Sequence, residues 1–374
     1  MKSIIYILFT GLLAMQSLLP AQTVSTNIKW AYAAQHNGEM KHLLATDKGE
    51  YLTLGTTEQG HLLIHCFTSK GKLKWKKLHH SYLEYHLHGD LTVPCWDQNG
   101  NIRFTVNNNS HQRLLLTVSP DGALIAAEEI SGLFNRKSAL WIHRVLEKDG
   151  LLYMIGALRG DLWIGVLDQA NTVVADLLYE GQFYEQDYDA LFDQKDRLII
   201  ALNSGKYGKY GGGYSLVEVV EVDLAQKKTF LRARFEGRTP QITQSEDGTF
   251  TIVYDSRTKA DEQHIFVKRF DSMFRELSRE ELLQCPYRSS PFYLDQSDNG
   301  ELSLSLAIST QLKVIEMNPS GTLAGQSALI SSRALNVNSL VRNGKRMAAI
   351  YTYMTGLEDP AEPSNMINNQ LVVW

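Results

Sequence analysis

The sequence has few cysteines, few prolines and no excess of basic charge. Its 374 residues include 3 Cys and 9 Pro, which excludes a disulfide-dense scaffold, a collagen-like chain and a proline-rich disordered chain. Its 37 basic and 41 acidic residues give a formal net charge of −4, without the basic excess of a dedicated nucleic-acid-binding protein. The hydrophobic fraction of 44% is that of an ordinary globular protein.

Long apolar runs are also missing, except at the N-terminus. Residues 4–19 are largely apolar and follow Lys2, and Ala21 provides a small residue at the expected cleavage point. This pattern is typical of a secretory signal peptide and is too short for a transmembrane helix. We therefore expect residues 1–21 to be a signal peptide and the mature protein to be exported, to the periplasm or the medium, without a membrane span.

The three cysteines leave two alternatives open. Cys66 and Cys95 could form a disulfide only if their strands are neighbours. Otherwise both thiols, together with that of Cys285, act as small buried hydrophobic groups.

A turn followed by a short apolar strand recurs along the whole chain. The turn positions are Gly49, Gly100, Gly150, Asp196, Gly248, Gly300 and Gly344. They are separated by 51, 50, 46, 52, 52 and 44 residues. Second turns, such as those at Gly71 and Gly122, come about two strands later, and the segments between turns are rich in β-branched and aromatic residues. Each repeat therefore reads as four strands joined by tight turns and a central loop.

Repeats of this length, each with four strands, predict an all-β fold, a seven-bladed β-propeller with four-stranded antiparallel blades. The segment 27–32 resembles segment 72–76, an outermost strand, while the last repeat stops at 370–374, in a third strand. We therefore expect the N-terminal strand to complete the last blade and close the ring, within a single domain at residues 22–374.

The repeat also resembles a known family. The pattern Asp-x-x-Gly-x-Leu-x-Leu-x-Gly, followed by Phe-Thr-x-x-Gly-x-Leu-x-Trp, is similar to that of secreted bacterial β-propeller-repeat proteins, a WD-like class, over residues 27–374. Leu73-Lys74-Trp75 also resembles the tryptophan-docking motif of quinoprotein propellers. Because only Trp30 and Trp75 match that motif, the resemblance implies no quinone cofactor, and the repeats imply a fold rather than an activity.

Two loop segments contain candidate ligand-binding residues. The second-to-third-strand and blade-to-blade connections look long and varied, so we expect a variable-loop face that carries function. On it lie His86 and His88, which lack the spacing of a metal site. The glycine-rich loop with Tyr207, Tyr210 and Tyr214 lacks the Gly-Lys-Ser/Thr ending of a phosphate loop. These residues either contact a ligand or are simply solvated.

A further set of candidates comes from aligning the repeats. The residues seven positions before each turn position are His42, Val93, His143, Asp189, Gln241, Tyr293 and Val337. Each is expected near the start of an innermost strand, by the channel mouth. Five are polar (His42, His143, Asp189, Gln241 and Tyr293), so they could bind a polar ligand, or they could line a water-filled channel.

These observations favour a binding module over an enzyme. The expected ligand is a protein or a glycan on the variable-loop face, and we expect a monomer with no metal, cofactor or nucleic acid. The alternative is a glycan hydrolase or lyase at the channel mouth that uses Asp187, Asp189 and His143, since acid–base catalysis needs only two suitably spaced groups.

Overall fold

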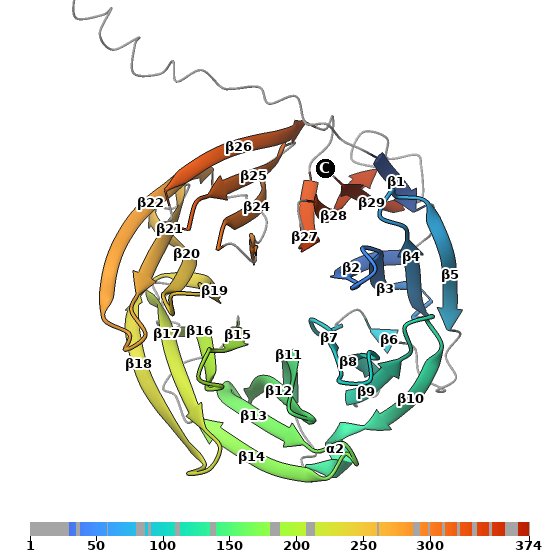
Figure 1. Ribbon diagram of the computed structural model, residues 1–374, viewed down its shortest axis with the longest axis horizontal. Coiled ribbons are helices and arrows are strands. Elements are labelled where there is room, and N and C mark those ends of the chain that lie inside the picture. Colours follow the sequence, from blue (N-terminus) through green and yellow to red (C-terminus); the bar gives the residue numbers. More distant parts are fainter. Residues whose placement is uncertain are drawn as a thin grey trace, which may run out of the picture.

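The computed structural model shows an all-β ring of antiparallel sheets. It describes residues 30–34, 38–57, 59–79, 87–88, 91–108, 113–134, 140–179, 188–206, 214–259, 262–286, 292–297, 300–308, 311–319, 322–330, 335–343, 346–355 and 366–373. The sheets are arranged around a central axis, each with one edge strand towards the axis and the other at the periphery (Figure 1). This is the four-stranded antiparallel propeller architecture that the repeat predicts.

Six of the sheets are regular four-stranded blades, five of which are continuous in sequence. Two of these five are made of β2 (Gly38–Ala45), β3 (Tyr51–Thr57), β4 (Leu62–Phe67) and β5 (Leu73–His79), and of β11 (Leu140–Lys148), β12 (Leu151–Leu158), β13 (Asp161–Leu167) and β14 (Val173–Tyr179). The next two are made of β15 (Tyr188–Phe192), β16 (Leu198–Lys206), β17 (Tyr214–Asp223) and β18 (Lys228–Glu236), and of β19 (Arg238–Gln244), β20 (Phe250–Lys259), β21 (Glu262–Phe270) and β22 (Glu276–Pro286). The fifth is made of β23 (Tyr293–Gln296), β24 (Leu302–Ile308), β25 (Gln311–Met317) and β26 (Leu323–Ile330).

The sixth blade joins the two ends of the described chain. Its strands are β27 (Leu335–Asn343), β28 (Arg346–Thr355), β29 (Met366–Val373) and β1 (Trp30–Ala34). β1 is its outermost strand and runs antiparallel to β29, with Trp30 opposite Val373 and Ala34 opposite Asn369. The N-terminal strand thus completes this blade, as the similarity between segments 27–32 and 72–76 predicts.

One further sheet, between the β2–β5 and β11–β14 blades, is irregular. It contains β8 (Ile102–Asn108), β9 (Arg113–Val118) and β10 (Leu124–Glu129), and its inner position is shared by two short strands, β6 (Leu87–His88) and β7 (Cys95–Trp96). Both short strands pair with β8. A four-residue helix, α2 (Ile130–Leu133), follows β10. Within the described residues, no helix has the length and apolar character needed to cross a bilayer.

The hydrophobic core consists of layers between neighbouring sheets. The middle strands β3 and β4 are buried along almost their whole length, because other sheets cover both of their faces. One cluster joins the β2–β5 blade to the β6–β10 sheet, and another joins the β11–β14 and β15–β18 blades. Each fully buried aliphatic side chain in these layers contributes about 1.5–3 kcal/mol, so the ring is stabilised by contacts between sheets as well as within them.

Asp-capped turns at the strand ends explain the periodic signal in the sequence. In the turn before β8, the Gly100 N–H donates to the Asp97 carbonyl at 2.9 Å, and Asp97 Oδ1 accepts the N–H groups of Asn99 and Asn101 at 2.8 Å. Gly100 has φ +75°, a conformation that favours glycine. Asp196, with φ +59°, takes the same place in its repeat, since Asp tolerates this region better than most residues.

The expectation that all second-to-third-strand connections are long is wrong. β12 and β13 are joined by the two-residue turn Arg159–Gly160, where both residues have positive φ, as in the tightest hairpins. β20 and β21 are separated by residues 260–261 alone.

Candidate functional site

The innermost strands are linked to one another around the axis by polar contacts. The Leu43 N–H donates to Ser339 Oγ at 3.2 Å, which joins β2 to β27. On its other side, the Nε2–H of His42 donates to the Leu91 carbonyl at 2.9 Å. Val93 then forms a parallel bridge with Arg144 of β11. These contacts connect the closing blade, the first blade, the irregular sheet and the β11–β14 blade.

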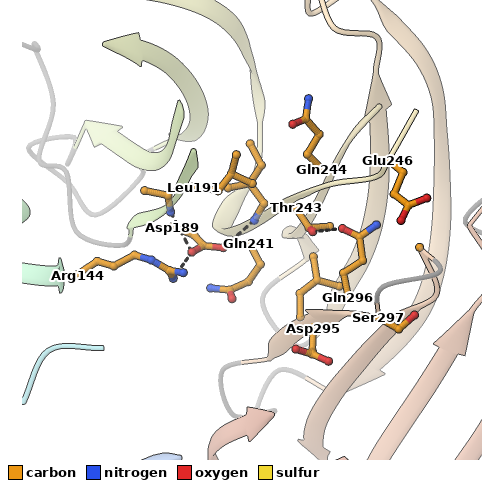
Figure 2. A pocket seen from close by; sticks show the side chains of 14 residues that line it. Arg144, Asp189, Leu191, Gln241, Thr243, Gln244, Glu246, Asp295, Gln296 and Ser297 are labelled. Atoms are coloured by element: carbon orange, nitrogen blue, oxygen red, sulfur yellow. Dashed lines mark hydrogen bonds and ion pairs between the residues drawn. The ribbon is translucent and has the colours of Figure 1, made fainter. Parts of the chain in front are cut away.

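Asp189 continues this series and joins three blades. Its Oδ1 forms an ion pair with Arg144 of β11, and its Oδ2 accepts the N–H of Ile242 of β19 at 2.8 Å. Oδ1 also accepts the Ala190 N–H at 2.9 Å. The Asp189 side chain is only 7% exposed, against 27% for Arg144. Both carboxylate oxygens are therefore occupied by fixed donors, as Figure 2 shows for the contacts with Arg144 and β19.

A polar cleft lies beside Asp189, along strands β15, β19 and β23. Its volume is about 510 Å³. The polar side chains that line it include Arg144, Asp189, Gln241, Thr243, Asp295 and Gln296 (Figure 2). Thr243 donates to Gln296 Oε1, which joins β19 to β23 across the cleft. The lining reaches Glu246 and Gly300 in the tight turns after β19 and β23, so the cleft runs along the inner strands.

The chemistry of this cleft favours neutral polar or cationic groups over anions. Within the described lining, Arg144 is the single cation and is already paired with Asp189. Asp295 and Glu246 add two further carboxylates. The amides of Gln241 and Gln296 can both donate and accept hydrogen bonds, as hydroxyl groups and peptide amides require.

His42 is a neutral group on the same inner ring. Burial lowers its pKa to about 4, partly opposed by the Leu91 carbonyl and reinforced by the positive charges of Lys41 and Arg144. Because Nε2 donates to the carbonyl, the neutral ring carries its proton there. His42 thus acts as an uncharged link between two sheets at neutral pH.

The five polar candidates from the aligned repeats all lie on strands nearest the axis, but they have different surroundings. Gln241 lines the cleft, and its Nε2 lies 3.4 Å from the Pro240 carbonyl. The His143 ring packs against Tyr188, with ring centroids 5.0 Å apart. Tyr293 is partly buried at the start of β23. Asp189 and Gln241 are thus the two candidates in the cleft lining, and whether any of the five binds a ligand stays a prediction.

The loop candidates lie largely outside the described residues. This holds for Tyr207, Tyr210 and His86, and also for Asp187 of the enzyme alternative. Tyr214 begins β17, and His88 lies in β6 opposite Asn107.

Aligning the repeats of the sequence does not identify four further polar residues of the cleft lining, Arg144, Thr243, Asp295 and Gln296. A β-bulge between Ile142 and Arg144 in β11 shifts the alternation of side chains. Arg144 rather than His143 therefore reaches Asp189. The signal available in the sequence for Thr243 was the alternation of polar Gln241 and Thr243 around apolar Ile242, since every second residue faces the same side of a strand.

Cys66, Cys95 and Cys285 form no disulfide in the structure, which resolves the two alternatives. Cys66 and Cys285 are buried and Cys95 is partly buried. Burial raises the pKa of Cys66 to about 11 and that of Cys95 to about 12, so both are protonated at neutral pH. Within the described part of the chain, no three His, Cys, Asp or Glu side chains gather as metal ligands.

The ring of four-stranded antiparallel sheets defines the protein as a β-propeller. Among solved structures, it is similar to the β-propeller domain of Nup133 from Vanderwaltozyma polyspora, with 8% identity, a TM-score of 0.54 and coverage of 91% of this chain and 97% of that one. A protein of unknown function from Dyadobacter fermentans has 10% identity and a TM-score of 0.52, with the same coverages.

The β-propeller domain of the Trilobed protease from Pyrococcus furiosus, described as having an open velcro topology, has 10% identity and a TM-score of 0.50. It matches over 84% of this chain and 92% of its own. No protein-family model and no curated protein matches the sequence. At these identities the similarity shows the fold alone.

Proposed function

We propose that this propeller is a binding module that holds a neutral or cationic polar group of a protein or glycan ligand in the cleft along β15, β19 and β23. The observation that supports this proposal is the 510 Å³ cleft lined by amide, hydroxyl and carboxylate side chains. A concave site with a few convergent polar groups on rigid strands is typical of ligand-binding sites.

The surroundings of Asp189 favour binding over glycan cleavage. A general acid or base needs an oxygen that can exchange a proton with substrate. Here Arg144 and the N–H groups of Ala190 and Ile242 occupy both oxygens of Asp189. The carboxylate therefore positions three blades, and the hydrolase or lyase is the weaker alternative.

We also propose that the ring has seven blades and that the protein is exported, as the sequence predicts. The irregular β6–β10 sheet counts as a seventh blade, whose inner strand is split between β6 and β7. Residues 1–21 direct the monomeric protein to the periplasm or the medium and are removed. N-terminal sequencing of protein from a culture fraction should then begin at Gln22.

A glycan array and a peptide array, probed with the mature protein, test the binding function. We expect Gln241→Ala to weaken a specific signal at least tenfold, because its amide lies in the cleft. Gln284→Ala, on the exposed surface of β22, is the matched control and should bind like the wild type. Equal binding by both variants, or glycan cleavage that Asp189→Asn abolishes, would contradict the proposal.

A further inference from the structure

A second, smaller cavity lies between the β6–β10 sheet and the β11–β14 blade. Its volume is about 140 Å³, and it lies where the tight turns before β8, β12 and β14 come together. A cavity of about 150 Å³ holds a molecule the size of benzene, with six heavy atoms. This cavity shares no lining residue with the cleft along β19.

Arg103 is the buried cation of this cavity. Its side chain projects from β8 and the residue is only 9% exposed. Its Nη2 donates to Asn171 Oδ1 at 2.8 Å, while its Nε is buried and has no hydrogen-bond partner among the described residues. Asn171 Nδ2 in turn donates to Glu128 Oε2. No carboxylate of the described residues forms an ion pair with Arg103, which is unusual because a buried charge is costly unless it is paired.

Carboxylates lie elsewhere on the lining of the same cavity. Glu147 Oε1 accepts the Gly150 N–H at 2.9 Å, and no described residue binds its Oε2. Asp97, in the turn before β8, also lines the cavity. The amide of Gln169 lies over Gly150, where a Cβ atom would come within 2.5 Å of Nε2. The cavity therefore combines an unpaired guanidinium with separate carboxylate groups.

We propose that this cavity binds a small zwitterion of the amino-acid class. The ligand carboxylate accepts hydrogen bonds from Arg103 and supplies the missing counter-charge. The ligand ammonium group faces Oε2 of Glu147, and the charge of Asp97, whose oxygens accept hydrogen bonds from Asn99 and Asn101, adds to its attraction. A simple anion would bind Arg103 but would be repelled by the two acidic side chains. A simple cation would be attracted by the acidic side chains but would leave Arg103 without a counter-charge. The volume fits glycine or alanine.

Calorimetric titration of the mature protein with glycine tests this assignment, with acetate and methylammonium as probes that carry one charge each. We expect saturable binding of glycine and at least tenfold weaker binding of either half-ligand. Arg103→Gln and, separately, Glu147→Gln should each weaken glycine binding at least tenfold. Glu147 keeps the site testable if the Arg103 variant does not fold.

Two control variants separate this site from the rest of the molecule. Arg275→Gln removes an exposed guanidinium that pairs with Asp271, and Gln241→Ala alters the larger cleft. Both variants should bind glycine like the wild type. Because the two cavities share no lining residue, the glycine result stands even if the cleft along β19 binds no ligand. Absence of saturable glycine binding, equal binding of acetate, or full binding by Glu147→Gln would overturn the assignment.

Discussion

At the scale of single residues, the Asp189 carboxylate links three blades through its contacts with Arg144, Ala190 and Ile242. Replacing it by Asn preserves the shape but removes the charge that faces Arg144. We expect Asp189→Asn to lower the free energy of unfolding by about 2 kcal/mol, since the partly buried guanidinium would lose its counter-charge. Chemical denaturation at neutral pH measures this loss.

The matched control is Asp196→Asn, which breaks an exposed pair. Asp196 lies 2.6 Å from Lys148 Nζ and its side chain is 65% exposed. Solvent screening limits such pairs to below about 1 kcal/mol, and Asn tolerates the positive φ of this position. Equal losses for the two variants would show that the Asp189 contacts contribute no more than a surface pair.

His42 makes the stability of the ring depend on pH. Its pKa is about 4 in the folded protein, against an ordinary value of 6.5, so below pH 6.5 the unfolded chain binds a proton that the folded protein does not. The free energy of unfolding should therefore fall as the pH decreases from 6.5 to about 4, by about 2–3 kcal/mol from this residue. Chemical denaturation at several pH values across this range measures the effect. The free energy of unfolding should change less with pH in His42→Gln, whose amide can still donate to the Leu91 carbonyl. An unchanged profile in that variant would contradict the assignment.

At the scale of elements, an outer strand docks on the turn of the next sheet. The Trp75 indole of β5 lies against Gly122, whose Cβ, if present, would come 2.5 Å from Cζ3. His79 Nε2 also lies 2.8 Å from the Gly122 carbonyl. We expect Gly122→Ala to cost about 3 kcal/mol, from the strain at φ +82° and from displacement of the indole. Chemical denaturation followed by tryptophan fluorescence measures the total loss of stability.

Gly100→Ala separates these two contributions. Gly100 has φ +75°, and a Cβ atom added to it would have no neighbouring atom within 4 Å. Its replacement should cost only the backbone strain, about 1 kcal/mol. If both alanine variants lost the same stability, the contact between Trp75 and the neighbouring turn would contribute nothing.

The sequence predicts these elements well because the turns carry most of the signal. Asp97 and Gly100 determine a tight turn by local hydrogen bonds and positive φ, so their spacing reveals the repeat without any knowledge of tertiary contacts. The length of the second-to-third connections was harder to predict. Arg159, at φ +57°, forms half of a two-residue turn, although Arg is not a residue that usually indicates one.

The candidate site was predicted only in part, because it depends on strand register. Asp189 and Gln241 follow from a fixed distance to the turn, and both line the cleft. Arg144 does not follow, since the bulge in β11 moves it by one position relative to a regular strand. Comparable shifts lie between Met40 and His42 in β2 and between Val337 and Ser339 in β27, at other distances from the turn, so the spacing of the turns does not reveal which residue of an innermost strand is displaced.

At the scale of the whole molecule, the pairing of β1 with β29 joins the beginning of the described fold to its end. Without β1, the edge of β29 would present unpaired N–H and carbonyl groups, which promote association between sheets. A variant lacking the residues before Gly38 should therefore unfold at a temperature roughly 5–10 °C lower. It should also self-associate.

A peptide of residues 28–37 provides the control for this truncation. Its central residues correspond to β1, so added in excess it should pair with β29, raise the melting temperature of the truncated protein and suppress self-association. A scrambled peptide of the same composition should do neither, because the pairing depends on register. Light scattering and thermal unfolding follow both effects. If the truncated protein stayed monomeric with an unchanged melting temperature, the stability of the ring would not depend on this strand, and closure would have to come from the contacts of β2 with β27, β28 and β29.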